Sequence, residues 1–186
     1  FFQNAQEIFD RFPEVDFGIY ECPMPWKRLV SLDFLRKVAP EGRMVFLKDT
    51  CCDYELIRER LKAVEGTPLK IFNANAQSWY DSYCHGSAGY NGVMANFHPD
   101  LYKWAYDHKD SDPEKAQLVA HFLTTAAMIE MRAYPVSAKY HQNLVDVPMS
   151  LVTRSADAAK LDKNARGEVE SLIAMENYVR KQLGIL

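Results

Sequence analysis

Two hydrophobic periods alternate along the first 110 residues of the chain. Residues 44–47 are consecutive and apolar, which is typical of a strand buried on both faces, whereas residues 53–64 carry apolar side chains at helical spacing. Further strands are predicted over residues 16–22, 69–72 and 89–95, and further helices over residues 1–12, 32–38, 78–86 and 99–108. Alternation at this short spacing indicates parallel βα units, in either an α/β barrel or a doubly wound sheet.

The pattern also predicts helix ends and faces. Ser31 is expected to cap the helix over residues 32–38. On the helix over residues 53–64, the charged residues expected to point outward are Arg58, Glu59, Arg60 and Lys62. Beyond residue 111 the strand pattern stops, and long helices are predicted over residues 112–131, 135–145 and 166–183, with a slack linker over residues 153–164. The chain is therefore α/β first and all-helical afterwards.

Composition narrows the class of protein. The chain has 186 residues, of which 48% are hydrophobic and 25% are charged, so a globular protein with a substantial core is expected. A net charge of −3 gives no reason to expect a nucleic-acid partner, and the absence of an apolar run of about 18 residues argues against a membrane span. We therefore expect a cytoplasmic protein without nucleic-acid or membrane partners.

The four cysteines give little sign of a metal site. They lack CxxC spacing, and in a cytosolic chain they are predicted to be reduced, partly buried thiols. A zinc site could in principle combine Cys51, Cys52, Cys84 and His85, but adjacent cysteines are poorly spaced for one metal ion. The five histidines are scattered without metal or triad spacing and are expected at the surface or on helix faces. No metal is predicted.

Lys48 and Tyr20 are the candidate catalytic residues. Lys48 follows the apolar run of residues 44–47, and Tyr20 lies near the end of the preceding predicted strand. The carboxyl ends of parallel strands are where α/β folds place their chemistry, and a partly desolvated lysine there can act as an amine nucleophile. A surface lysine and a core aromatic are the alternative interpretations.

Weaker candidates follow the same strand ends. Thr50, Asn73, Asn75 and Asn91 would lie at the same edge of the sheet and could bind a substrate, although solvated loop residues explain them equally well. The sequence contains neither a phosphate-binding loop nor a dinucleotide fingerprint, so no organic cofactor is implied.

Four short motifs occur in an order and spacing that resemble the dihydrodipicolinate synthase / N-acetylneuraminate lyase family. They are Tyr20-Glu21-Cys22-Pro23, Phe46-Leu47-Lys48-Asp49-Thr50, Gly86-Ser87-Ala88-Gly89 with Ala95-Asn96, and Tyr134-Pro135-Val136-Ser137-Ala138-Lys139-Tyr140. The resemblance implies a (β/α)8 TIM barrel followed by extra helices, and a class I mechanism in which a lysine forms a Schiff base with a 2-keto acid. Residues 1–110 would then be the C-terminal half of the barrel, with strands five to eight, and residues 111–186 a C-terminal helical extension.

The same resemblance implies what lies beyond this sequence. A complete barrel needs about 250 residues, so the N-terminal half of the barrel is expected in a longer protein, and these 186 residues alone are not expected to be active. The implied partners are pyruvate or a related 2-keto acid, an aldehyde, and further copies of the chain in a dimer or tetramer. The implied reaction makes or breaks a carbon–carbon bond or removes water.

Family members that act on semialdehydes have a motif similar to Y-N-x-P-x-R, and this sequence departs from it at two positions. Glu21 replaces the asparagine and Pro25 occupies the arginine position, although Lys27 or Arg28 could supply a cation from a shifted turn. The departure keeps a second function open, that of a keto-acid-binding or regulatory barrel without catalysis.

Overall fold

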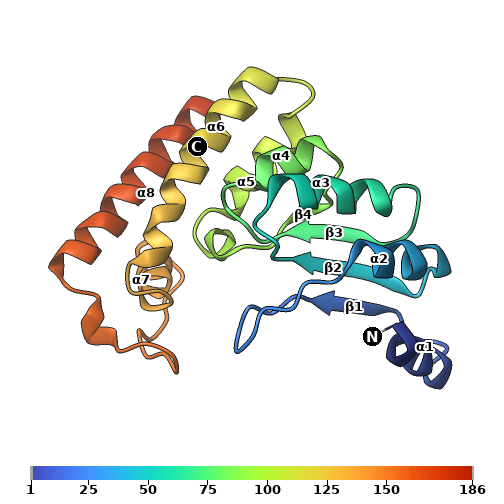
Figure 1. The fold of residues 1–186 in the computed structure, drawn as a ribbon. Coiled ribbons are helices and arrows are strands. Elements are labelled where there is room, and N and C mark those ends of the chain that lie inside the picture. Colours follow the sequence, from blue (N-terminus) through green and yellow to red (C-terminus); the bar gives the residue numbers. More distant parts are fainter. Residues whose placement is uncertain (1, 186) are drawn as a thin grey trace. The chain divides into compact units, whose positions relative to one another are not determined.

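A four-stranded parallel sheet forms the centre of the first part of the molecule. The computed structural model describes residues 2–185. The strands are β1 (Phe17–Tyr20), β2 (Met44–Asp49), β3 (Lys70–Asn73) and β4 (Gly89–Tyr90). They lie in chain order and all pairs are parallel, as the arrows in Figure 1 show. The predicted succession of parallel βα units, followed by helices, is confirmed.

Helices precede and connect the strands. Before β1 comes α1 (Phe2–Arg11), and the connections contain α2 (Leu32–Val38), the 3-10 helix η1 (Ala39–Glu41), α3 (Tyr54–Ala63) and α4 (Trp79–Cys84). The predicted cap of α2 is confirmed, since Ser31 Oγ accepts a hydrogen bond from Phe34 N at 3.1 Å. Asp53 caps α3 in the same way through Leu56 N at 2.8 Å. Leu35, Leu47 and Ile57 are buried in the core between α2, α3 and the sheet.

The fourth strand is much shorter than predicted. The prediction of a strand over residues 89–95 is wrong after Tyr90, and Val93–Asn96 form a 3-10 helix, η2. The last hydrogen bond to β3 runs from Asn91 N to Asn73 O at 2.8 Å. At Gly92 the backbone passes so close to the Tyr90 phenol that a Cβ atom would be 2.1 Å from its hydroxyl oxygen, so only a glycine fits where the chain leaves the sheet.

The described residues divide into two compact units, with the boundary between Gly92 and Val93. The second unit contains η2, α5 (Pro99–His108), α6 (Pro113–Ala126), the 3-10 helix η3 (Ala127–Met131), α7 (Val136–Leu144), the 3-10 helix η4 (Ala158–Lys160) and α8 (Lys163–Leu183). The expected linker over residues 153–164 includes η4 and the start of α8, so it is more ordered than predicted. The expected boundary between barrel and extension at residue 110 stays a prediction.

Two histidines lie in the core of the helical unit, whereas all five were expected at the surface or on helix faces. His141 does lie on α7, but on its buried face. His98 and His141 are fully buried on either side of Glu176, which is also fully buried. Glu176 Oε1 lies 2.7 Å from His98 Nδ1, and Glu176 Oε2 lies 3.0 Å from His141 Nε2. No helix within residues 2–185 is both long and apolar enough to cross a membrane.

Candidate functional site

Lys48 and Tyr20 lie side by side at the carboxyl ends of β1 and β2. The two residues are register partners in the parallel ladder, and Lys48 Nζ lies 4.3 Å from the centroid of the Tyr20 ring. An ammonium group at this distance from a phenol face is attracted by the ring quadrupole. The prediction that a lysine and a tyrosine end neighbouring strands is thus met by a direct contact between their side chains. Their catalytic roles remain predictions.

The phenol is accessible to solvent and protonated. Tyr20 is 50% exposed, so its hydroxyl can reach a bound molecule. Partial burial raises the pKa of Tyr20 above its ordinary value, and interaction with the Cys22 side chain raises it further. A phenol with a raised pKa keeps its proton at neutral pH and is therefore a proton donor toward a neighbouring oxygen.

Thr50 is buried, and both its hydroxyl and its backbone N–H donate hydrogen bonds to Glu21, which follows β1. Its hydroxyl donates to Glu21 O at 2.7 Å, and its backbone N–H donates to Glu21 Oε2 at 3.0 Å. The residue is therefore placed at the predicted edge, but its donors bind the neighbouring strand. Its role in binding a substrate remains a prediction.

Asn73, Asn75 and Asn91 also lie at this edge, around the start of α4. Asn73 is buried, and its Nδ2 donates to Ser78 Oγ at 3.0 Å while its Oδ1 accepts from Asn75 N at 2.8 Å. Asn75 Oδ1 accepts from Ser78 N at 2.9 Å, and Asn91 N donates to Asn73 O at 2.8 Å. The amides of Asn73 and Asn75 therefore shape the turn into α4, whereas Asn91 is half-buried and joins the turn through its backbone N–H.

A buried ionic cluster lies directly behind the pair, and the sequence analysis missed it. Arg60 was expected on the outward face of its helix, but it is fully buried and binds both Glu21 and Asp49. Its Nη1 donates to Glu21 Oε2 at 3.0 Å and also to Asp49 Oδ2, and its Nη2 lies 2.8 Å from Glu21 Oε1. The helical spacing could have predicted the burial of Arg60, because Ile57, Arg60 and Leu61 lie on one face of the helix.

The cysteines near the site are more exposed than predicted. Cys22 and Cys52 are exposed and Cys51 is half-buried, because all three lie in the loops after β1 and β2 and not inside the strands. Burial, together with the nearby carboxylate of Asp49, raises the pKa of the Cys51 thiol to about 12. Lys27 Nζ lies 3.8 Å from Cys52 Sγ, so this cation reaches the loop that follows Lys48.

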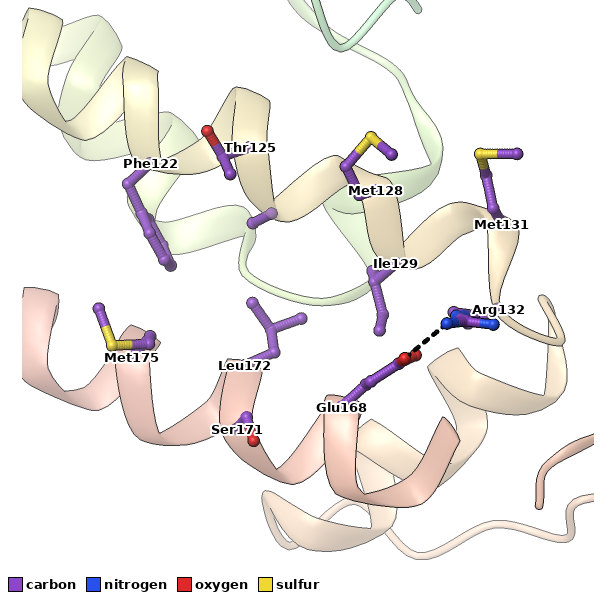
Figure 2. Close-up of a pocket in the computed structure, with 11 residues that line it drawn as sticks. Phe122, Thr125, Met128, Ile129, Met131, Arg132, Glu168, Ser171, Leu172 and Met175 are labelled. Carbon is purple, nitrogen blue, oxygen red and sulfur yellow. Dashed lines mark hydrogen bonds and ion pairs between the residues drawn. The ribbon is translucent and has the colours of Figure 1, made fainter. Parts of the chain in front are cut away.

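A groove in the helical unit, shown in Figure 2, is a different kind of surface. It has a volume of about 720 Å³ and lies between α6 with η3 on one side and α8 on the other. Met128, Ile129 and Met175 line it, and one ion pair, Arg132 with Glu168 at 2.7 Å, crosses it. Its lining is mostly apolar and offers no paired amine and phenol, so the candidate site is the one at Lys48.

Comparison with known proteins identifies the fold. No protein-family model matches the sequence, and no curated protein matches it either. Solved structures do match, and they define the class as the C-terminal part of a barrel of the dihydrodipicolinate synthase and sialic acid aldolase type. The expected resemblance is thus confirmed for the fold.

Three solved structures illustrate the match. The sialic acid aldolase of Ruminococcus gnavus has a TM-score of 0.79 at 16% identity, over 97% of this chain and 61% of the aldolase. The dihydrodipicolinate synthase of Acinetobacter baumannii, complexed with pyruvate, has a TM-score of 0.78 at 15% identity, over 95% and 60% of the two chains. The prophage protein YagE of E. coli K12, which belongs to the dihydrodipicolinic acid synthase family and also holds pyruvate, has a TM-score of 0.79 at 16% identity, over 95% and 60%. This chain therefore spans about 60% of the length of these proteins.

Proposed function

We propose that this chain is part of a class I lyase or aldolase that forms a Schiff base between Lys48 and pyruvate or a related 2-keto acid. The observation that carries the proposal is the position of Lys48 Nζ over the Tyr20 ring, at the carboxyl ends of adjacent parallel strands. Two of the similar structures hold pyruvate, which makes a small 2-keto acid the first substrate to test.

The chemistry follows from the two side chains. The unprotonated Lys48 amine adds to the ketone carbon, and the ketone oxygen takes up a proton to give a carbinolamine. Loss of the hydroxyl as water leaves an iminium ion, which withdraws electrons from the adjacent carbon and allows an enamine to form. Tyr20 donates and recovers the protons that these steps require, since its phenol is protonated and beside the amine.

The complete site needs more of the barrel than these four strands supply. We propose that four further βα units close the barrel and hold the carboxylate of the keto acid. The loop after β1 affects which second substrate can bind. Pro25 occupies the position where an arginine would bind a semialdehyde, and the nearby cation Lys27 lies close to Cys52. A cytoplasmic location and a homo-oligomer complete the proposal.

Borohydride trapping tests the proposal directly. Full-length protein incubated with pyruvate and borohydride is expected to gain the mass of a reduced pyruvate adduct on the peptide that contains Lys48. Lys48→Arg should abolish the adduct, because a guanidinium is not a nucleophile at neutral pH.

Lys70 supplies a matched control. It lies on β3 at the opposite end of the same sheet and is exposed, so Lys70→Arg should leave the adduct unchanged. A wild-type protein that gains no adduct with several 2-keto acids would reject the Schiff base. If the same protein still binds those acids reversibly, the function is keto-acid binding without catalysis, which the missing arginine at Pro25 favours.

A further inference from the structure

The two residues that follow the candidate pair point to the other face of the sheet. Side chains alternate along a strand, so Glu21 and Asp49 face away from Tyr20 and Lys48 and toward α3. Glu21 is 2% exposed and Asp49 is fully buried, and both bind Arg60 of α3. A single guanidinium thus connects the residues next to both members of the pair.

Arg60 also reaches the loop after β1. Its Nη2 donates to Val30 O at 2.7 Å, while Val30 N donates to Glu21 Oε1 at 2.8 Å. The planar fork of an arginine holds its donors in fixed directions, so contacts to Glu21, Asp49 and Val30 O define one position for the ends of both strands. A lysine at this position has a single ammonium group and cannot span the same acceptors.

The strand that carries Tyr20 needs such a connection. Its ladder with β2 is irregular between Phe17 and Gly18, and the bond that continues the ladder, from Glu21 N to Lys48 O, is long at 3.3 Å. The shorter links at this end come from Glu21, whose carbonyl accepts from the Thr50 hydroxyl at 2.7 Å and whose carboxylate accepts from Thr50 N at 3.0 Å. Side-chain contacts therefore hold the register of β1 near the site.

We propose that Glu21, Arg60 and Asp49 form a positioning cluster, which holds the Tyr20 ring beneath the Lys48 amine. The cluster is not needed for stability alone, because apolar residues of similar volume often stabilise a fold as well as a buried ion cluster does. The cluster instead specifies one register of two strand ends. The inference rests on the proposed function for its catalytic meaning, but the geometry can be measured without any turnover.

The measurement is the ¹H–¹³C spectrum of full-length protein labelled with ¹³C-lysine. A lysine held 4.3 Å from a ring centroid has its terminal methylene protons moved upfield by the ring current, and Lys48→Arg assigns that signal. Tyr20→Leu should return the signal to the position of the other lysines. We expect Arg60→Met to lose at least half of the upfield offset.

Arg60→Lys separates positioning from simple charge neutralisation. It keeps the positive charge between Glu21 and Asp49, so the protein is expected to fold even if Arg60→Met does not, and the offset should still fall by at least half. Arg58→Met is the matched control, since Arg58 lies on the same helix and binds Asp81 and Glu55, away from the pair. That variant should keep the whole offset.

Three outcomes decide the inference. Loss of the offset in Arg60→Lys, with Arg58→Met unchanged, supports the cluster as a positioning device. A full offset in folded Arg60→Lys or Arg60→Met, or an equal loss in Arg58→Met, overturns it. If the offset behaves as expected while wild-type protein forms no borohydride adduct, the positioning cluster stands and the proposed Schiff base fails.

Discussion

Tyr20 is the residue whose chemistry can be separated most cleanly from its packing. The ring lies beneath Lys48 Nζ, and the residue is half exposed. Removing only the hydroxyl therefore leaves the contact with the amine and takes away the proton carrier.

Tyr20→Phe is expected to lower the turnover number of the full-length protein by about a hundred- to ten-thousand-fold, which is the usual contribution of a general acid–base group. The melting temperature should stay within about 2 °C of wild type, because an exposed hydroxyl contributes little to stability. Water can still carry protons slowly, so the borohydride adduct on Lys48 should form at a reduced rate. A turnover number within about threefold of wild type would show that Tyr20 carries no essential proton.

At the scale of single residues, the sequence predicted the pair but not its support. Lys48 and Tyr20 were accessible to prediction because each ends an apolar strand with a reactive side chain. Arg60 was missed because a charged residue on a helix is usually solvated, whereas this one is buried against carboxylates at the ends of β1 and β2. Its partners are 39 and 11 residues away in the chain, so helical periodicity alone could not supply them.

At the scale of elements, Glu176 joins three helices of the second unit. It belongs to α8 and contacts His98, which precedes α5, and His141 of α7. Arg180, one turn further along α8, lies 3.3 Å from Glu176 Oε2. Although burial alone would raise the pKa of Glu176, hydrogen bonds from His141 and His98 lower it to about 2.

This lowered pKa predicts how stability depends on pH. A carboxyl that is more acidic in the folded than in the unfolded state stabilises the fold above its unfolded pKa, and the contribution is lost as the pH falls through the folded value. Glu176 should therefore contribute fully above about pH 5 and lose its contribution toward pH 2.

Glu176→Gln is expected to lower the free energy of unfolding by about 3 kcal/mol at pH 7, and by much less at pH 2, where the wild-type carboxyl takes up its proton. Urea titrations at pH 7, 4 and 2 measure the difference. Glu170→Gln is the control, because Glu170 lies on the same helix but is exposed. A constant difference between Glu176→Gln and wild type across this range would contradict the assignment.

The elements themselves were largely predictable, and the errors have physical causes. The helix over residues 99–108 matches α5, since a proline at its first position marks its start. The fourth strand was overestimated because apolar residues 93–95 suit a 3-10 helix as well as a strand, and only a glycine fits at residue 92, where the chain leaves the sheet. Buried histidines were missed because the carboxylate that binds them lies 78 residues beyond His98.

At the scale of the molecule, the order and spacing of four short motifs indicated the fold, although overall sequence identity to the similar structures is low. The similar structures are only 15–17% identical to this chain, and no family model matches it, yet TM-scores reach 0.79. Short motifs at fixed spacing indicate which residues meet at strand ends, so they can point to a fold where overall sequence identity is low.

Glu21 has a consequence for how relatives of this chain would evolve. A buried glutamate after the tyrosine is tolerable only with a cation to meet it, and here that cation lies twelve residues after the lysine, at Arg60. Glutamate and arginine should therefore be gained and lost together across an alignment. A search for similar chains can therefore treat the tyrosine–glutamate pair and the distant arginine as one linked signature.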